Sequence, residues 1–342
     1  MRAVGLTEFG GPDVLHVVDL PEPHAGLGEI RVRVRAAAVN PADSLLRSGA
    51  AAWLLRDIPG PYVPGQDVAG TVDEIGPGTV TDLAFGDPVI AMVLPFLPRP
   101  DGTADYFGGG YAEHVVLPAG WVTRAPQDVD HATASTLPLN GLTALLTLDQ
   151  LALAPGAVLA VTGAAGAVGG YVVQMAAAAG LVVIADAAPA DETMVRKSGA
   201  AKIVARGDDV ARRIRAIQPA GVDALVDAAL VGPQVVDAVR DGGSLALLRG
   251  NGEPGAYAAG AGRGITVRTP FVPDYAGRAD RLAEIRRLTE HGVLLPRVAR
   301  TLAPADAPEA HRLLEAGGVR GRLVLTSALA ADGLPKRARS RT

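Results

Sequence analysis

The sequence contains no cysteine among its 342 residues. This absence excludes disulfide bonds, thiol nucleophiles, thiolate zinc sites and cysteine-ligated iron–sulfur clusters. Aromatic residues are scarce at 4%, and glycine or charged residues interrupt the strongly apolar stretches, so no membrane-spanning segment is predicted. Because the first ten residues lack the apolar core of a signal peptide, we expect a cytoplasmic protein.

Charge of one sign is not in large excess either. The chain has 32 Lys and Arg residues against 36 Asp and Glu residues, a formal net charge of -4. This balance gives no global positive field, so neither nucleic acid nor a membrane is expected as a partner. Basic residues gather in the tail from about residue 335, which we expect to be disordered. A basic anchor for an acidic partner is the less favoured interpretation of that tail.

The pattern of apolar residues changes along the chain and predicts a two-domain α/β protein. In residues 29–39, Ile30, Val32 and Val34 alternate with arginines, as in a half-exposed strand. Gly-Pro and Pro-Gly pairs then interrupt short Val and Ile runs, which favours a compact β-barrel. From about Leu137, short apolar runs alternate with helix-length segments, which favours a doubly wound parallel sheet.

The expected elements from this point of the chain onward are six strands and four helices, followed by a last strand. The strands are expected at residues 157–163, 181–185, 202–205, 224–227, 244–248 and 265–272. The helices are expected at residues 144–153, 167–179, 192–198 and 280–291. A last strand at Arg322 to Thr326 is expected to return the chain to the first domain.

The strongest local signal is the glycine-rich segment Val161-Thr-Gly-Ala-Ala-Gly-Ala-Val-Gly-Gly170, which follows a predicted strand and opens a predicted helix. In such a turn, glycines let the backbone approach a pyrophosphate, and the helix N-terminus presents free N–H groups. The first glycine position of the usual pattern holds Ala164 instead. An ordinary tight strand-to-helix turn is the alternative. The residues expected to bind a dinucleotide here are Gly163, Ala164, Gly166, Ala167, Val168 and Gly169.

Asp186 lies at the end of the next predicted strand, about 20 residues beyond the turn, where an acidic residue usually binds the adenosine ribose. An aspartate there repels a 2′-phosphate, so the residues favour NAD(H) over NADP(H). The nearest basic residues are Arg196 and Lys197, at the far end of the following helix. Alternatively, Asp186 is a strand-end carboxylate that only bonds local backbone.

Further segments carry a resemblance that runs nearly from end to end. They are Met1-Arg-Ala-Val4, Ala38-Val-Asn-Pro-Ala-Asp43, Pro64-Gly-Gln-Asp-Val-Ala-Gly70, Gly86-Asp-Pro-Val89, Gly110-Tyr-Ala-Glu113 and Gly317-Gly-Val-Arg-Gly-Arg-Leu-Val-Leu325. With the glycine-rich turn, they make the sequence similar to the medium-chain dehydrogenase/reductase superfamily, in its zinc-free, zeta-crystallin-like quinone oxidoreductase branch.

The resemblance implies a GroES-like β-barrel catalytic domain and a Rossmann cofactor domain. We place the first at residues 1–125 and 274–342 and the second at residues 126–273. It also implies hydride transfer from a nicotinamide, NADP(H) as the cofactor of related enzymes, and a homodimer joined through the cofactor domains.

Zinc-dependent members of this superfamily bind a catalytic metal with cysteine and histidine, and the matching positions here look like Asn40 and Gln66. Neither side chain replaces such a ligand, so the resemblance implies a metal-free reductase. Such an enzyme suits an electron-poor acceptor, a quinone or an α,β-unsaturated carbonyl, for which positioning and hydrogen bonding suffice. An enoyl reductase of a biosynthetic pathway and a non-catalytic nicotinamide-binding or sensing protein are the alternatives.

The candidate catalytic residues are Asn40, Gln66, Asp43 and Tyr62. The amides of Asn40 and Gln66 could donate to a carbonyl oxygen as charge builds there. Tyr62 and Tyr111 are candidate proton donors, because Leu45 and Leu46 stand near the position where many relatives carry a tyrosine. The alternative is that the polar residues tie two loops together and that the tyrosines are packing residues.

Three more residues are expected near the nicotinamide. Thr143 matches a superfamily position beside the nicotinamide ribose. Arg249 and Gly250 follow the fifth predicted strand, at the sheet edge where ligands bind in such folds. Residues 99–109 are either a lid over the cleft or an ordinary surface loop.

Overall fold

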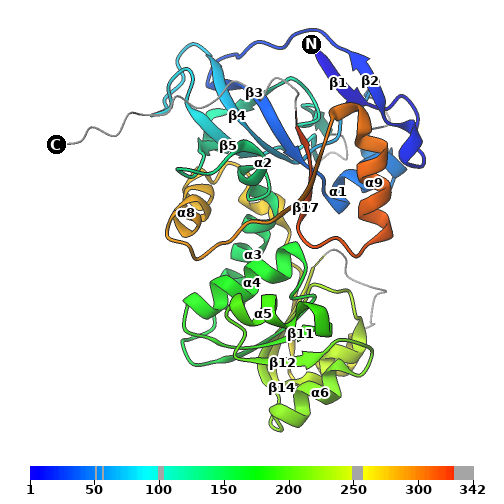
Figure 1. Cartoon of the computed structure of the whole chain (residues 1–342), viewed down its shortest axis with the longest axis vertical. Coiled ribbons are helices and arrows are strands. Elements are labelled where there is room, and N and C mark those ends of the chain that lie inside the picture. The colour runs from blue at the N-terminus through cyan, green and yellow to red at the C-terminus, as the bar shows by residue number, and fades with distance from the viewer. Residues whose placement is uncertain (51, 56–57, 99–103, 249–256, 327–342) are drawn as a thin grey trace, which may run out of the picture.

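The structure, a computed structural model, describes residues 1–50, 52–55, 58–98, 104–248 and 257–326. These residues form two sheet-based parts that stand one above the other in Figure 1. Between them lie α2 (His131–Ala134), α3 (Pro138–Leu151) and α8 (Ala279–Glu290). The chain starts in the upper part, descends through the lower part, and returns with β17 (Arg322–Thr326) to the upper sheet.

The lower part is a parallel sheet of six strands in the order β12-β11-β10-β13-β14-β15. The strands are β10 (Val158–Thr162), β11 (Val182–Ala187), β12 (Lys202–Ala205), β13 (Val222–Asp227), β14 (Val239–Leu247) and β15 (Thr266–Arg268). Successive residues of β10 face two different cores, because Leu159 packs with α4 (Ala167–Ala178) while Ala160 packs with α6 (Val210–Ile217). This doubly wound parallel sheet confirms the predicted fold class.

The predicted elements of this part match the structure with two informative differences. The strand 202–205 is found with the predicted limits. Helix α5 (Glu192–Lys197) ends one residue before the predicted limit, and α8 (Ala279–Glu290) begins and ends one residue earlier than predicted. The strand expected over 265–272 is only Thr266–Arg268, because Pro270 cannot donate to a strand ladder. Helix α3 begins at Pro138, earlier than expected, since proline is well suited to the first turn of a helix.

The upper part contains a mostly antiparallel sheet in the order β16-β17-β3-β4-β5-β9, with β8 also paired to β3. Its strands are β3 (Glu29–Ala38), β4 (Asp67–Ile75), β5 (Pro88–Met92), β8 (His114–Pro118), β9 (Val122–Arg124), β16 (Val298–Leu302) and β17. In β3, Ile30 and Val32 are fully buried and alternate with more exposed arginines, as predicted.

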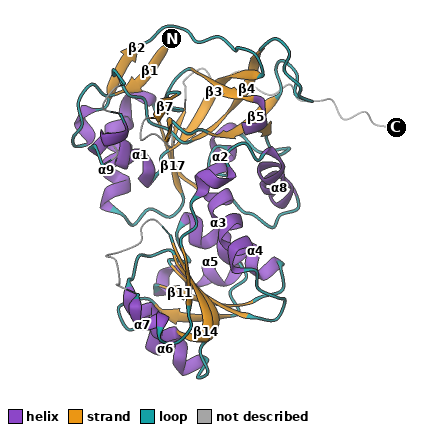
Figure 2. Cartoon of the chain, turned by 180° about the vertical axis from the view of Figure 1, so that it is seen from behind, coloured by secondary structure: helices purple, strands orange, loops and turns teal. Residues whose placement is uncertain are grey.

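Two hairpin pairs and two helices complete the upper part. The pairs are β1 (Arg2–Gly5) with β2 (His16–Asp19) and β6 (Phe96–Pro98) with β7 (Ala104–Tyr106). Helices α1 (Pro41–Ser48) and α9 (Ala307–Ala316) lie together on one side (Figures 1 and 2). In the segment 99–109, which the sequence left as either a lid or a surface loop, residues 99–103 lie outside the described residues, and the residues that follow them form β7.

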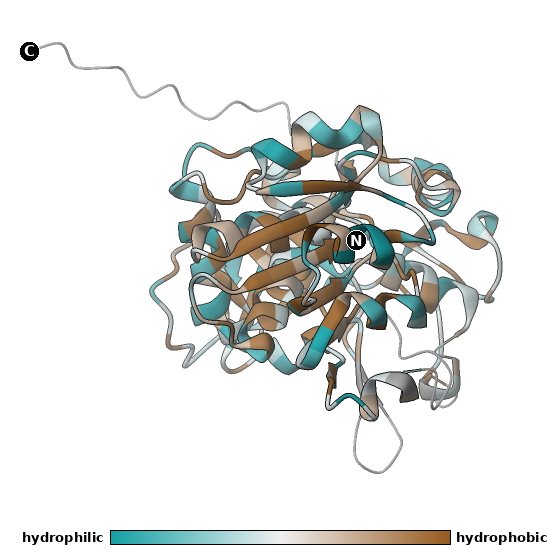
Figure 3. Cartoon of the chain, turned by 90° about the horizontal axis from the view of Figure 1, so that it is seen from below, coloured by the Kyte–Doolittle hydropathy of each residue, from teal (hydrophilic) through white to brown (hydrophobic). Residues whose placement is uncertain are grey.

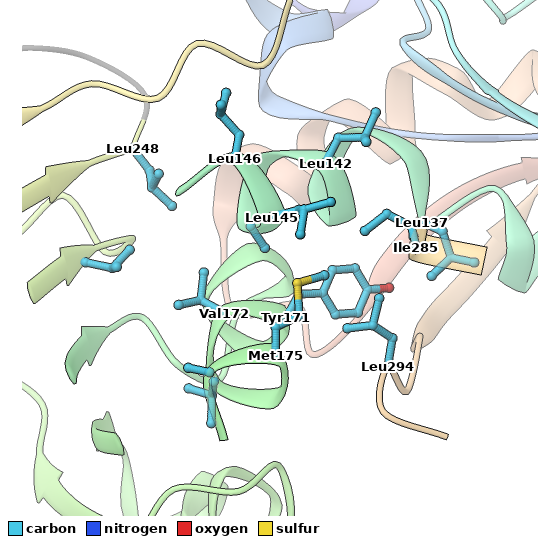
Figure 4. Packing of buried hydrophobic residues seen from close by; sticks show 14 of the residues in the cluster. Leu137, Leu142, Leu145, Leu146, Tyr171, Val172, Met175, Leu248, Ile285 and Leu294 are labelled. Atoms are coloured by element: carbon cyan, nitrogen blue, oxygen red, sulfur yellow. The ribbon is translucent and has the colours of Figure 1, made fainter. Parts of the chain in front are cut away.

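Helix α3 is the packing centre between the two sheets. Its Leu142 and Leu145 share a buried cluster with Tyr171 and Met175 of α4 and with Ile285 of α8 (Figure 4). Viewed from below, hydrophobic strands fill the middle of the molecule (Figure 3). The strands of each sheet come from the segments that the sequence assigned to each domain, while the domain limits themselves stay a prediction. None of the described helices is long and apolar enough to cross a membrane.

Candidate cofactor and substrate site

The glycine-rich turn connects β10 to α4 in the lower part, as predicted. Gly163 has a φ of 69°, a conformation that glycine adopts without strain. A Cβ on Gly169 would lie 2.3 Å from the Gly163 carbonyl oxygen, so only glycine lets the helix approach the strand this closely. Gly166 caps α4 without a side-chain hydrogen bond. The first N–H groups of α4 are therefore left for an anion, so the turn fits a dinucleotide pyrophosphate.

Asp186, near the end of β11, lies directly against this turn. One of its carboxylate oxygens accepts a hydrogen bond from the Ala164 N–H at 3.2 Å, and the residue is 6% exposed. Burial raises the pKa of Asp186, and the backbone N–H groups of Ala164 and Gly163 and the charge of Arg206 act against this rise. The hydrogen bond to local backbone, which the sequence analysis gave as the alternative role of Asp186, is thus present. Binding of the adenosine ribose by Asp186 stays a prediction.

Two arginines that the sequence analysis did not select lie beside this turn, and the charge of a third, Arg206, acts on Asp186. Arg297 donates to the carbonyl oxygens of Ala165 at 3.0 Å and Gly166 at 3.4 Å. Arg297 and Arg322 also line one small cavity beside the first turns of α4. Arg206 follows β12 and is exposed. Arg297 and Arg322 lie more than a hundred positions from the turn in the sequence, and Arg206 follows a different strand. No local sequence motif therefore marks any of them.

Asn40 belongs to a fully buried polar cluster with Asp67 and Arg322. Its amide nitrogen donates to the Ala38 carbonyl at 3.1 Å and to Asp67 Oδ2 at 2.9 Å. Its amide oxygen accepts from Arg322 at 2.7 Å, and Arg322 lies 3.3 Å from Asp67 Oδ2. Asp67 Oδ1 also accepts from the Leu139 N–H at the start of α3. Both N–H groups of Asn40 are therefore occupied within the protein, as in the loop-tying alternative.

Asp43 forms a second buried cluster on the other side of Asn40. It accepts from the backbone N–H groups of Asn40 at 2.8 Å and Gly65 at 3.0 Å, and from the Tyr111 hydroxyl at 3.2 Å. Tyr111 in turn lies 3.3 Å from Nε2 of the buried His311. Burial raises the pKa of Asp43 to about 7, against the lowering effect of these donors. Burial also lowers the pKa of His311 to about 4, so this imidazole is neutral at pH 7.

The remaining predicted residues occupy different surroundings. Gln66 is half-buried between Gly65 and β4, and no side-chain partner is found for it within the described part of the chain. The Tyr62 hydroxyl donates to the Ile58 carbonyl at 2.6 Å, and its ring stacks on Phe9. The Thr143 hydroxyl donates to the Leu139 carbonyl at 2.7 Å, one helical turn back. Gln66 is therefore the candidate whose amide is free to meet a substrate.

Two predicted residues and the predicted tail are not placed. Arg249 and Gly250 lie outside the described residues, as does the tail from about residue 335. Among the described residues, no group of three or more His, Asp or Glu side chains is arranged to hold a metal ion.

Two family models match the chain. The model of the alcohol dehydrogenase GroES-like domain matches residues 26–127, and the model of zinc-binding dehydrogenases matches residues 198–325. These matches fall on the two sheet-based parts of the structure and on the segment that returns between them.

Solved structures and curated relatives agree with these matches. A crystal structure of an NAD-dependent alcohol dehydrogenase is 32% identical with a TM-score of 0.83, covering 95% of this chain and 99% of that one. The structure of a mycobacterial protein complexed with NADPH is 29% identical with a TM-score of 0.80, covering 95% and 100%. The quinone oxidoreductase of Pongo abelii is 32% identical over 210 residues, which are 59% of this chain and 58% of the relative.

Proposed function

Because this chain belongs to the medium-chain dehydrogenase/reductase superfamily and is an NAD(P)-dependent oxidoreductase, we propose that its hydride acceptor is a quinone or an α,β-unsaturated carbonyl compound. The observation that carries this proposal is the character of the polar residues beside α1 and β4. Asn40 and Gln66 stand at the two positions expected for metal ligands, and Asn40 is locked by Asp67 and Arg322. These residues supply hydrogen bonds and no thiolate or imidazole ligand, which suits an acceptor that is already electron-poor.

In this proposal, Gln66 contacts the acceptor. Its amide N–H donates to the carbonyl oxygen as negative charge develops there during hydride transfer. Asn40 and Asp43 position the loop before α1, because their hydrogen bonds go to Asp67, Gly65 and Tyr111. The ring of Tyr62 stacks on Phe9, and its hydroxyl donates a hydrogen bond to the Ile58 carbonyl oxygen. Tyr62 can act as the proton donor only if its hydroxyl leaves that carbonyl oxygen.

The cofactor supplies the hydride when bound, and the chain supplies the contacts that hold it. We assign its pyrophosphate to the N-terminus of α4, with the positive charges of Arg297 and Arg322 beside it. Arg322 suits this role because its Nη1 atom is buried and has no partner in the described part of the chain. We assign Thr143 to the nicotinamide end by resemblance, and Arg249 and Gly250 by their predicted place after the fifth strand, at the sheet edge where ligands bind in such folds.

For the adenosine ribose, we propose Asp186 and therefore a preference for NAD(H) over the NADP(H) that the resemblance implies. Its carboxylate lies against the turn and disfavours a neighbouring 2′-phosphate. Arg206 is the residue that would hold such a phosphate if the preference were reversed, because its charge acts on Asp186 and its side chain is exposed.

The test is a titration of the purified protein with NADH and with NADPH in one buffer, followed by nicotinamide fluorescence. We expect NADH to bind about tenfold more tightly, a difference of about 1.4 kcal/mol. Tighter NADPH binding that is lost in Arg206→Ala would refute the role of Asp186. Binding of neither would end the reductase proposal. Binding without consumption of cofactor in the presence of quinones and enones would favour the sensing alternative.

An acceptor panel then separates the proposed activity from its closest alternative. Under the proposal, benzoquinones and simple enones are reduced with stoichiometric loss of NADH absorbance. Reduction of conjugated thioesters alone would instead identify an enoyl reductase of a biosynthetic pathway.

We also propose that the protein is a homodimer joined through the parallel sheets. Strand β15 is the edge of the six-stranded sheet, and all three of its residues are exposed. An exposed edge strand can pair with its copy in a second chain. Light scattering coupled to size-exclusion chromatography should give twice the chain mass, and a monomer at micromolar concentration would contradict this assembly.

A further inference from the structure

A groove in the upper part lies where strand β3 changes partners. On one edge, β3 pairs with β8 as far as Arg33 opposite His114, and with β17 from Ala36 opposite Thr326. Between these pairings, the Val34 N–H donates to the Glu113 carbonyl at 2.9 Å. Because β8 and β17 diverge here, a groove with a volume of about 350 Å³ remains, which we call the β3 groove. This volume is in the range of small-molecule sites.

The walls of the β3 groove are largely apolar. Its lining includes Val17 of the β1–β2 hairpin, Tyr111, Pro304 and Leu325 of β17. Val17 is 49% exposed, and the groove gives this large apolar side chain a partner surface. The groove is therefore suited to an aliphatic chain.

The lining of the β3 groove carries an excess of positive charge. Arg2 and Glu113 form an ion pair of 3.0 Å, so their charges cancel. Arg33 and Arg35 also line the groove, and neither guanidinium has a hydrogen-bond or ion-pair partner within the described ranges. Burial and then the charge of Arg35 lower the pKa of His131, as an unneutralised cation would. Two guanidinium groups without a partner along one groove fit a carboxylate.

We propose that the β3 groove binds an aliphatic monocarboxylate, with its carboxylate on Arg33 and Arg35 and its chain along Val17 and Pro304. This site is separate from the cofactor turn, which lies in the other sheet-based part. It is connected to the site of the proposed function through Tyr111, which lines the groove and donates to Asp43. The proposal does not depend on which acceptor the enzyme reduces.

The experiment is a calorimetric titration of the full chain with decanoate, with decanol as the uncharged comparison. We expect one site that prefers decanoate, with binding at least tenfold weaker in Arg33→Ala/Arg35→Ala. The matched control is Arg212→Ala/Arg287→Ala, which removes two exposed arginines of α6 and α8, helices that contribute no residue to the groove lining, and should bind decanoate like the parent. Val17→Asp, which places a carboxylate on the apolar wall, should also abolish binding.

Several results would overturn the proposal. One is the absence of decanoate binding, and another is equal loss in both double variants. Competition with saturating NADH or NADPH would place decanoate in the cofactor cleft instead. Binding that appears only after deletion of residues 327–342 would show that the chain's own tail takes this position. Cofactor affinity should be unchanged in Arg33→Ala/Arg35→Ala, which distinguishes loss of the groove site from loss of the fold.

Discussion

Replacing Arg322 by methionine should destabilise the protein strongly, and more at high pH than at low pH. Arg322 donates to Asn40 Oδ1 at 2.7 Å and to the Val39 carbonyl at 2.9 Å, and it lies 3.3 Å from Asp67. All these groups are buried, and Asp67 is 0% exposed. Removing one partner of a buried ion pair costs about 3–5 kcal/mol, since the remaining charge has no counterion. Because methionine retains most of the side-chain length of arginine, lost packing accounts for the smaller part of the loss in stability.

The pH dependence follows from the remaining carboxylate. Burial raises the pKa of Asp67 and the charge of Arg322 lowers it, so the variant leaves a carboxyl with a still higher pKa in the folded state. A group with a raised folded pKa stabilises the protein below its unfolded pKa and loses this contribution as pH rises. The deficit of Arg322→Met should therefore be largest at pH 8 and shrink toward pH 5.

Urea unfolding at 25 °C, followed by circular dichroism at both pH values, measures this deficit. The double variant Asp67→Asn/Arg322→Met should be more stable than Arg322→Met at pH 8, because no unpaired charge remains. Arg240→Met, which breaks the more exposed pair of 2.8 Å with Asp223, should cost less than about 1 kcal/mol. The reasoning would be refuted if Arg322→Met lost less free energy of unfolding than Arg240→Met. It would also be refuted if the loss in Arg322→Met did not depend on pH.

Three further predictions concern the glycine-rich turn, Asp43 of α1 and Gln66 before β4. Gly169→Ala places a Cβ 2.3 Å from the Gly163 carbonyl oxygen and should weaken cofactor binding at least tenfold by fluorescence titration, about 1.4 kcal/mol. Gly262→Ala, whose Cβ meets nothing within 4 Å, should bind cofactor like the parent. Because the folded pKa of Asp43 is about 7 against an ordinary 3.8, its contribution to stability falls by about 4 kcal/mol as pH rises from about 4 to about 7. The free energy of unfolding of Asp43→Asn should lack this fall with pH. A variant whose pH profile matches that of the parent would refute the raised pKa of Asp43. Gln66→Ala should lower kcat for quinone or enone reduction by about 10- to 100-fold with the cofactor Kd unchanged, whereas an unchanged kcat would remove Gln66 from the proposal.

Much of the fold could be predicted because local patterns and tertiary packing agree. Strand β12 was predicted with its observed limits, and β10, α4 and β11 within two residues at each end. Apolar runs of this length between glycines are compatible with a buried parallel strand and with little else. The limits failed where the local sequence conflicts with the pattern, as at Pro270 after β15. The glycine-rich turn was predictable for the same reason, since its whole geometry lies within ten successive residues.

The environment of Asn40 was not predictable from its motif, because Asp67 and Arg322 come from two distant segments. Even so, the pairing of Asp67 with Arg322 has a sequence signal of a different kind. Each is the first residue of a strand whose next three residues are buried, β4 and β17. A charge at the head of a buried strand requires a partner of opposite sign or a pKa shift. Two such strand-heading charges of opposite sign therefore predict each other, and Asn40 is held at the point where they meet.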